Sequence, residues 1–188
     1  MNKVSTMTSA AALLMAIAVP AADHNEKIIF VTSATFDGNL GGLTGADDKC
    51  QAEADSPASI VPSGTYLAWL SDGSDSPDTR FTKSSYPYML PDGTKIAEDF
   101  TDLTDGSILH TIDIDSTGKP LGLQFFWSGT NSDGTTVQHF VACYGWTAGR
   151  LRGFRGVVGS TVQTSTLWSV YSSQKRCGRS FRLACFQQ

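Results

Sequence analysis

Four cysteines constrain the fold of this chain more than any other feature of its sequence. They are Cys50, Cys143, Cys177 and Cys185. An even number of cysteines behind an export signal is typical of disulfide bonds. The alternative is a structural zinc site, but the sequence has no CxxC pair and its histidines are not at zinc-finger spacing. We therefore expect two disulfides, and since four cysteines permit three pairings, spacing alone leaves the pairing open.

The first residues have the pattern of a secretory signal peptide. Lys3 supplies a positive charge, and an apolar run follows over residues 10–19. Val19-Pro20-Ala21 offers small residues where a signal peptidase cuts. We expect residues 1–21 to be the signal peptide, because the apolar run is too short for a comfortable membrane span. The mature protein is then secreted, periplasmic or on the cell surface, without a transmembrane anchor.

Residues 22–188 are predicted to form a single α+β domain, because the chain shows no internal repeat and no linker. Apolar residues at helical spacing predict a helix over 43–54, with Thr44 as N-cap, Asp47 completing a capping box and Cys50 facing inward. The Gly-rich stretch 148–166 is predicted to be irregular. Strand patterns are found at residues 27–32, 64–70, 108–114, 125–127 and 181–186.

Charge is divided unevenly along the chain. All 18 acidic residues lie at or before Asp133, so the remainder carries only basic charges. We predict a basic patch that binds an anionic ligand, such as a sulfated glycan or an acidic protein face, because the guanidinium fork suits sulfate and carboxylate. The alternative is that Asp99, Asp102 or Asp105 folds over the patch and neutralises it. The predicted patch consists of Arg150, Arg152, Arg155, Lys175, Arg176 and Arg179.

Motifs of known enzyme classes are absent from the sequence. It contains no GxSxG, no HExxH and no phosphate-binding glycine loop. His110 and His139 lie in strand-like contexts typical of structural or solvated histidines. The acidic loops 72–78 and 113–115 do not match an EF-hand, so we interpret them as solvated turns. We expect no catalysis, cofactor, metal or nucleic-acid partner; the alternative is an extracellular hydrolase that uses two carboxylates converging across a cleft.

Four segments, in the same order, resemble the bacterial endostatin-like domains, which include leptospiral endostatin-like surface proteins and belong to the C-type-lectin-like superfamily. Together the four segments extend over most of the mature chain. They are residues 41–51 (GGLTGADDKCQ), residues 64–71 (GTYLAWLS), residues 127–134 (WSGTNSDG) running on to Cys143, and Cys177 with Leu183-Ala184-Cys185.

The resemblance implies a C-type-lectin-like fold of small twisted antiparallel sheets, one or two helices and long loops. It also implies the disulfides Cys50–Cys185 and Cys143–Cys177. Members resemble binding modules for extracellular matrix proteins, host proteins or anionic glycans. The histidine-rich N-terminus that holds zinc in endostatin is reduced here to His24, and the calcium motifs Glu-Pro-Asn and Trp-Asn-Asp are missing. We therefore expect a non-catalytic binding module without metal; the other alternative is a structural domain of an envelope assembly.

Overall fold

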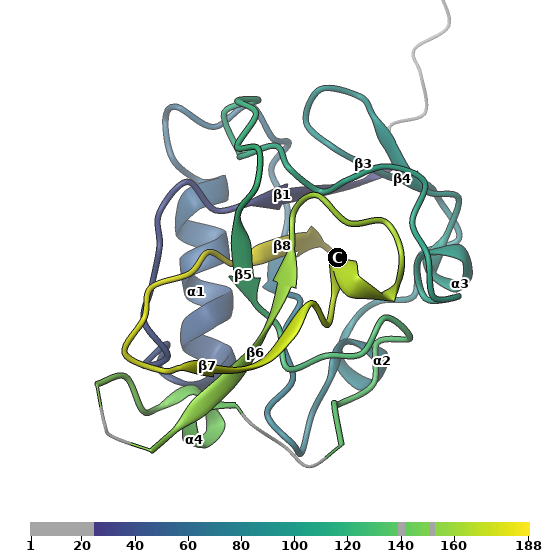
Figure 1. Cartoon of the computed structure of the whole chain (residues 1–188). Helices are drawn as coiled ribbons and strands as arrows, with labels where there is room; N and C mark the ends of the chain where they lie inside the picture. The colour runs from purple at the N-terminus through teal and green to yellow at the C-terminus, as the bar shows by residue number, and fades with distance from the viewer. Residues whose placement is uncertain (1–24, 139–141, 151–152) are drawn as a thin grey trace, which may run out of the picture.

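The computed structural model describes residues 25–138, 142–150 and 153–188 (Figure 1). The predicted signal peptide, residues 1–21, lies outside this part of the chain. His24, His139 and Arg152 also lie outside it.

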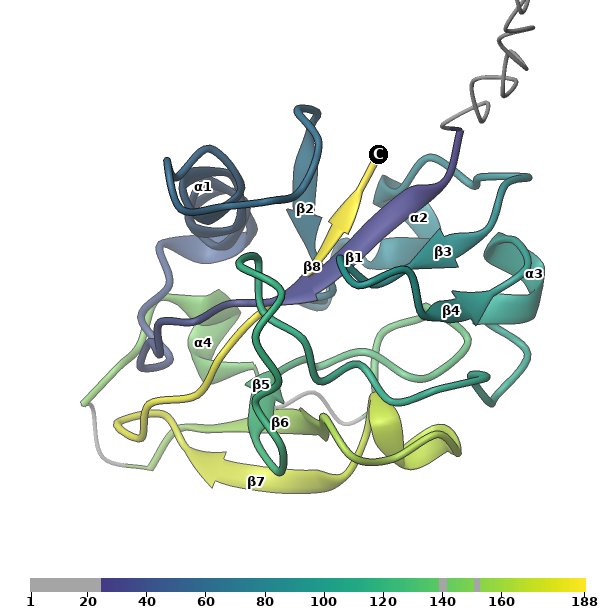
Figure 2. The same cartoon turned by 90° about the horizontal axis from the view of Figure 1, so that it is seen from above.

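The described residues form an α+β fold, as the sequence predicted. One sheet has five strands in the order β2-β8-β1-β3-β4, and a smaller sheet has the order β5-β6-β7. All neighbouring strands run antiparallel except β1 and β3. In Figure 2 the larger sheet fans out between α1 and α3, and the smaller sheet lies below it. The elements are β1 (Lys27–Val31), α1 (Gly42–Ala54), β2 (Tyr66–Ala68), α2 (Pro77–Arg80), β3 (Tyr88–Met89), β4 (Lys95–Ala97), α3 (Phe100–Leu103), β5 (Phe125–Trp127), α4 (Cys143–Trp146), β6 (Arg155–Ser160), the 3-10 helix η1 (Thr166–Trp168), β7 (Ser172–Arg176) and β8 (Ala184–Gln187).

Strand β8 occupies an inner position of the larger sheet, although it comes last in the chain. Its residue Cys185 lies opposite Phe30 of β1 on one side and Ala68 of β2 on the other. Cys185 also forms a disulfide with Cys50 of α1. One residue of β8 therefore joins the first strand, the longest helix and an edge strand.

Both disulfides connect the cysteines as the family resemblance implied. Cys50–Cys185 and Cys143–Cys177 each have a Cα–Cα distance of 5.5 Å, within the usual range for disulfides. The described residues contain no free cysteine. The first bridge closes a loop of 135 residues in sequence separation and the second a loop of 34. The longer loop restricts the unfolded chain more, so chain-entropy arguments assign the larger stabilisation, about 4 kcal/mol, to Cys50–Cys185.

Helix α1 covers the outer edge of strand β2 with polar side chains. The backbone N–H of Ala68 donates to Asp47 at 2.9 Å, and that of Tyr66 donates to Gln51 at 3.0 Å. Asp47 and Gln51 are four residues apart and so lie on one face of the helix. They accept the hydrogen bonds that a further strand would otherwise take, which protects an edge open to strand pairing.

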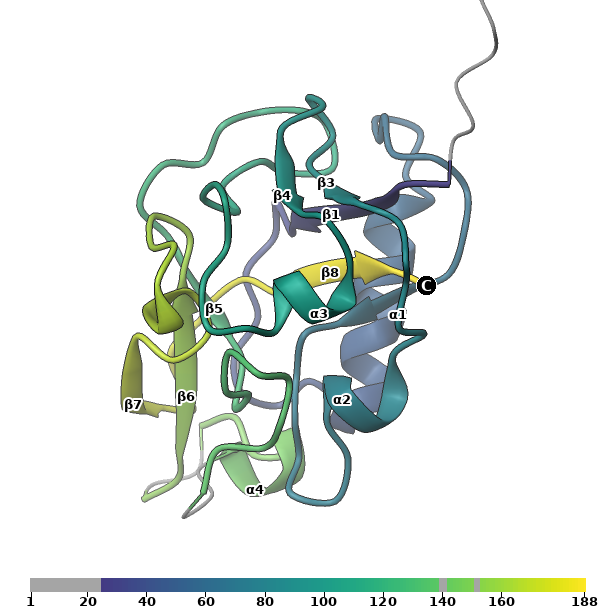
Figure 3. The ribbon, with the colours of Figure 1, turned by 90° about the vertical axis from the view of Figure 1, so that its right-hand side faces the viewer.

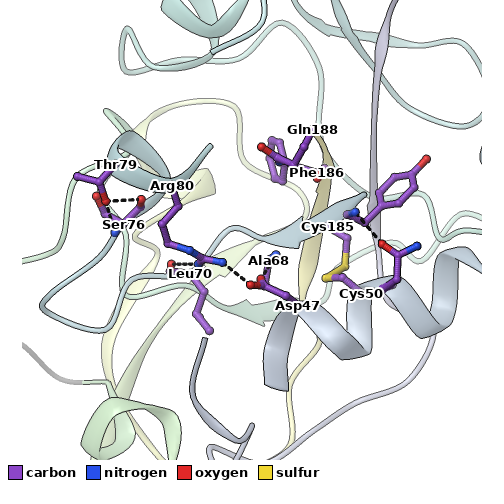
Figure 4. A network of polar contacts seen from close by, with 12 residues as sticks. Asp47, Cys50, Ala68, Leu70, Ser76, Thr79, Arg80, Cys185, Phe186 and Gln188 are labelled. Carbon is purple, nitrogen blue, oxygen red and sulfur yellow. Dashed lines mark hydrogen bonds and ion pairs between the residues drawn. A yellow bond between two sulfur atoms is a disulfide. The ribbon is translucent and has the colours of Figure 1, made fainter. Parts of the chain in front are cut away.

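Asp47 also connects α1 to α2 (Figure 4). Its carboxylate pairs with the guanidinium of Arg80, which in turn donates to the carbonyl of Leu70 at 3.3 Å. Burial raises the pKa of Asp47, and the bonds from Ala68 and Arg80 act against that rise without cancelling it.

The capping box predicted for Thr44 and Asp47 is wrong. The N-cap of α1 is Gly41, with φ 87°, and Asp47 is used in tertiary contacts instead.

Apolar side chains fill both faces of the larger sheet. Ile29 and Val31 of β1 belong to one core cluster, and Phe30 between them belongs to the other. This alternation follows from the two-residue period of a strand. The second cluster lies between the sheet, α1 and the smaller sheet, and it contains Trp127 and Trp146, both with no exposed surface.

Two predictions of local structure are wrong. Residues 108–114 form no strand: Ile108, Ile112 and Ile114 are buried, but the segment makes only an isolated bridge, from Ile114 to Pro120. The Gly-rich stretch 148–166, expected to be irregular, contains β6.

The glycines of β6 are required by what packs against them. A Cβ atom at Gly156 would lie 2.8 Å from the ring of Trp127 and 2.9 Å from the sulfur of Cys143. A Cβ atom at Gly159 would collide with the ring of Phe126 and the carbonyl oxygen of Trp168. From the sequence alone, glycines at these positions argue against a strand. In this fold they let aromatic rings approach the backbone.

Gly156→Ala should therefore lower the free energy of unfolding by about 1–3 kcal/mol, the usual effect of overpacking a core. Gly178→Ala is the matched control, because its Cβ would meet its nearest neighbour at 3.5 Å, an ordinary contact. Urea unfolding of both variants measures the difference. Equal stability of the two variants would contradict this account of β6.

Candidate basic binding groove

Two pairs of arginines from separate segments of the chain line one groove of about 610 Å³. Arg155 opens β6 and lies opposite Arg176 at the end of β7. Arg150 comes from the segment before β6, and Arg179 from the turn after β7. The side chains of all four are exposed. The lining of the groove comes from the start of β6, the end of β7 and the segments next to them; Figure 1 shows β6 and β7 side by side at the lower left. The described residues that line it are Arg150, Gly153, Phe154, Arg155, Arg176, Gly178 and Arg179.

The Cys143–Cys177 bridge brings the two pairs of arginines together. Arg176 and Arg179 flank Cys177, whose backbone N–H donates to the carbonyl of Phe154 at 3.2 Å. Gly178 lies next to Arg150, where a Cβ on the glycine would make an ordinary contact of 3.5 Å with the arginine Cα. The chain segments on either side of the groove are thus fixed to one another covalently and by backbone contacts.

Among the described residues that line the groove there is no carboxylate. The ion pairs within the described part of the chain are Arg80–Asp47, Lys83–Asp78 and Lys95–Glu98, and none involves a groove arginine. The carboxylate of Asp37 lies against Gly149, which precedes Arg150, and accepts from the backbone N–H of Asn39 at 3.0 Å.

The three acidic residues proposed to neutralise the patch accept backbone hydrogen bonds in and around α3. Asp99 accepts from the backbone N–H of Asp102 at 2.9 Å, and Asp102 accepts from that of Glu98 at 2.7 Å. Asp105 accepts from the backbone of Ser107 at 3.0 Å. These bonds fix α3 and the turn after it. Asp99, Asp102 and Asp105 are not among the described residues that line the groove, which does not favour the alternative that they neutralise the patch.

The predicted patch is brought together only in part. Arg150, Arg155, Arg176 and Arg179 share the groove, whereas Lys175 does not line it. The ammonium of Lys175 lies over the ring of Phe125, 5.5 Å from its centroid. Side chains alternate between the two faces of a strand, so neighbours such as Lys175 and Arg176 point in opposite directions.

An exposed pair of aromatic rings lies beside the groove. This pair was not predicted from the sequence. Phe154, 38% exposed, lines the groove, and its ring centroid lies 5.6 Å from that of Tyr144, which is 72% exposed. Tyr144 belongs to α4, seen next to β6 in Figure 3. The only signal in the sequence is the Cys-Tyr-Gly-Trp run, where a tyrosine stands between residues that are expected to be buried.

The α4 segment is a single turn of left-handed helix. Cys143, Tyr144, Gly145 and Trp146 have φ values of 47°, 56°, 64° and 61°. This conformation costs about 1–2 kcal/mol for each residue other than glycine. Buried anchors on both sides of Tyr144 hold the turn: the Cys143 disulfide, and a hydrogen bond of 2.7 Å from the Trp146 indole to the carbonyl of Ser71.

The acidic loops form turns rather than a shared site. Asp72 accepts from the backbone N–H groups of Ser74 and Asp75, both at 2.9 Å. Within the described residues, no group of three or more His, Cys, Asp or Glu could hold a metal ion. A second hollow, of about 700 Å³, has a mainly apolar lining that includes Ile60 and Met89, with Glu26 as its one carboxylate.

Asp115 closes the turn at residues 115–119. It is buried, and it accepts from the Thr117 hydroxyl at 2.7 Å and from the backbones of Thr117 and Lys119 at 2.9 and 3.0 Å. Burial alone would raise the pKa of Asp115, but these bonds and the charge of Lys119 outweigh it, and the pKa lies below its ordinary value. A lowered pKa means that the folded protein binds this proton less readily than the unfolded chain does. The stabilisation is therefore present at neutral pH and is lost as the pH falls through the acidic range.

Asp115→Ala should lower the free energy of unfolding by about 1–3 kcal/mol at pH 7, the effect of losing hydrogen bonds to a charged acceptor. The gap between the variant and the original protein should narrow toward pH 3, because the unfolded chain takes up this proton more readily than the folded protein. Asp113→Ala is the control, because Asp113 accepts one long bond, of 3.4 Å, from Thr111. Urea unfolding at both pH values tests this, and a gap that stays constant would contradict it.

The fold and groove define a disulfide-linked α+β protein with a basic surface groove. A family model described as "Protein of unknown function (DUF1554)" matches residues 33–164, more than half of the chain. The chain belongs to this family. The matched range includes Arg150 and Arg155, whereas Arg176 and Arg179 follow it. No curated protein matches the chain.

Proposed function

We propose that this protein is an exported, non-catalytic binding module that holds an anionic extracellular ligand in the arginine groove. The observation that carries the proposal is the convergence of four exposed arginines without a carboxylate in the lining. Like charges placed together repel, and a ligand with several negative groups relieves that repulsion. The ligand is therefore an anionic glycan or the acidic face of a matrix or host protein.

The arrangement of the arginines suits such a ligand. Guanidinium groups bind sulfate and carboxylate through two parallel hydrogen bonds, which gives direction as well as attraction. Arg155 already donates one bond, of 3.0 Å, to the carbonyl of Gln174. That bond fixes the guanidinium beside β7 and leaves its other N–H groups for a ligand, so less side-chain freedom is lost on binding.

The proposed family and compartment agree with this function. We assign the domain to the endostatin-like branch of the C-type-lectin-like fold. Support comes from the nested disulfides and from the pairing of the first strand, β1, with the last, β8. Disulfides persist in oxidising compartments, which favours secretion, the periplasm or the cell surface. Within the described residues, no helix is long and apolar enough to cross a membrane.

Non-catalytic binding is favoured over the hydrolase alternative by where the carboxylates lie. Glycosidases need two carboxylates facing each other across a cleft. Among the described lining residues, the basic groove has no carboxylate and the apolar hollow has one, Glu26. Asp72 and Asp115 are engaged in their own turns.

The test is elution from a heparin column by a salt gradient. The mature protein should bind at low salt and elute below about 1 M salt, because salt screens surface charges. Arg155→Ala combined with Arg176→Ala should elute at clearly lower salt. Lys83→Ala combined with Lys119→Ala is the matched control, since it removes the same charge outside the groove lining.

The order of elution decides the proposal. The groove is supported if the arginine variant elutes well before the lysine variant. Two variants that elute together would show that net charge alone governs retention. A protein that passes through the column at low salt would refute the proposed function.

A further inference from the structure

Tyr144 is the most exposed large apolar side chain of the described residues, and it stands at the rim of the basic groove. It is 72% exposed, against 60% for Leu123 and 59% for Ile60. Its ring contacts that of Phe154, with the ring planes inclined at 56°. An exposed aromatic pair beside a charged groove is a common feature of binding surfaces, where rigid rings supply contact area.

Packing does not explain why Tyr144 is held there. Its neighbours in the left-handed turn, Cys143 and Trp146, are fully buried, and the carbonyl of Trp146 accepts from the backbone of Leu40 at 2.8 Å. These contacts fix the turn without using the tyrosine ring. Residues in sparsely populated backbone regions gather at ligand-binding positions, because the surrounding structure must hold them in place.

We infer that Tyr144 and Phe154 form an aromatic platform that makes the groove selective for acidic polysaccharides. The inference rests on the proposed function and names the ligand class. Phe154 directly precedes Arg155, so one short segment supplies both ring surface and guanidinium. A ligand that contacts both the aromatic rings and the guanidinium groups carries anionic groups next to rings with C–H-rich faces. A chain of acid-substituted sugar rings presents both features at every repeat.

Two other classes of polyanion use only half of the surface. Linear inorganic polyphosphate offers charge without rings. An acidic polypeptide such as polyglutamate offers carboxylates on flexible stems. Both should bind through the arginines and gain little from the platform. The platform therefore distinguishes ligands that the arginines alone would treat alike.

The experiment measures the affinity of the mature protein for dextran sulfate, polyphosphate and polyglutamate by titration calorimetry. Tyr144→Ala should weaken dextran sulfate binding about three- to tenfold, the effect of losing one aromatic contact. It should change binding of the other two polymers less than about twofold. Tyr144→Phe keeps the ring and should bind like the original protein. Tyr86→Ala removes an exposed tyrosine, 47% exposed, outside the groove lining and is the matched control.

The outcomes separate this inference from the proposed function. If no polymer binds the original protein, the proposed function fails, and the platform with it. If the arginine double variant loses all three polymers while Tyr144→Ala binds them normally, the groove stands and the platform is refuted. Equal losses for all three polymers in Tyr144→Ala would assign the tyrosine a structural role. A selective loss of polyglutamate would make the partner an acidic protein.

Discussion

The pairing of β8 with the strands on either side of it is the constraint on which the rest of the structure depends. The final strand lies between β1 and β2, and through Cys185 it is bonded to α1. Contacts between the two ends of a chain are costly to form, because they close the longest loop. The disulfide reduces that cost by restricting the unfolded chain. Once the ends are joined, the segments between them need only short strands and turns.

The smaller sheet depends on this frame and carries the candidate function. The backbone of Trp127 in β5 donates to the carbonyl of Arg182, just before β8, at 3.0 Å, and β6 packs its glycines under the aromatic rings of the core. The Cys143–Cys177 bridge then fixes the segments that carry the groove arginines. Rigid support of this kind favours binding, because less conformational freedom is lost when a ligand arrives.

Acidic and basic side chains therefore have different roles in this fold. Acidic side chains at or before Asp133, such as Asp47, Asp99 and Asp115, bond to nearby backbone and hold helices, edges and turns in place. The four groove arginines, which follow Asp133 in the chain, remain exposed. The charge asymmetry of the sequence is thus not cancelled by folding: the acidic groups are used structurally, and the groove keeps its positive charge.

The sequence by itself determined the features that arise from local patterns. Apolar runs predicted β1, β2, β5 and β8, helical spacing predicted α1, and the cysteine count predicted two disulfides. Only the tertiary structure decided the rest. The sequence places Gly156 and Gly159 in a loop, whereas in the structure they lie in β6 with aromatic rings from distant segments packed on them. Lys175 and Arg176 are neighbours in sequence, yet the strand places only Arg176 in the groove. The Cys-Tyr-Gly-Trp run alone does not predict that Tyr144 is exposed, because its exposure is fixed by the contacts of the buried Cys143 and Trp146. These features depend on which segments meet in space, and no local pattern records that.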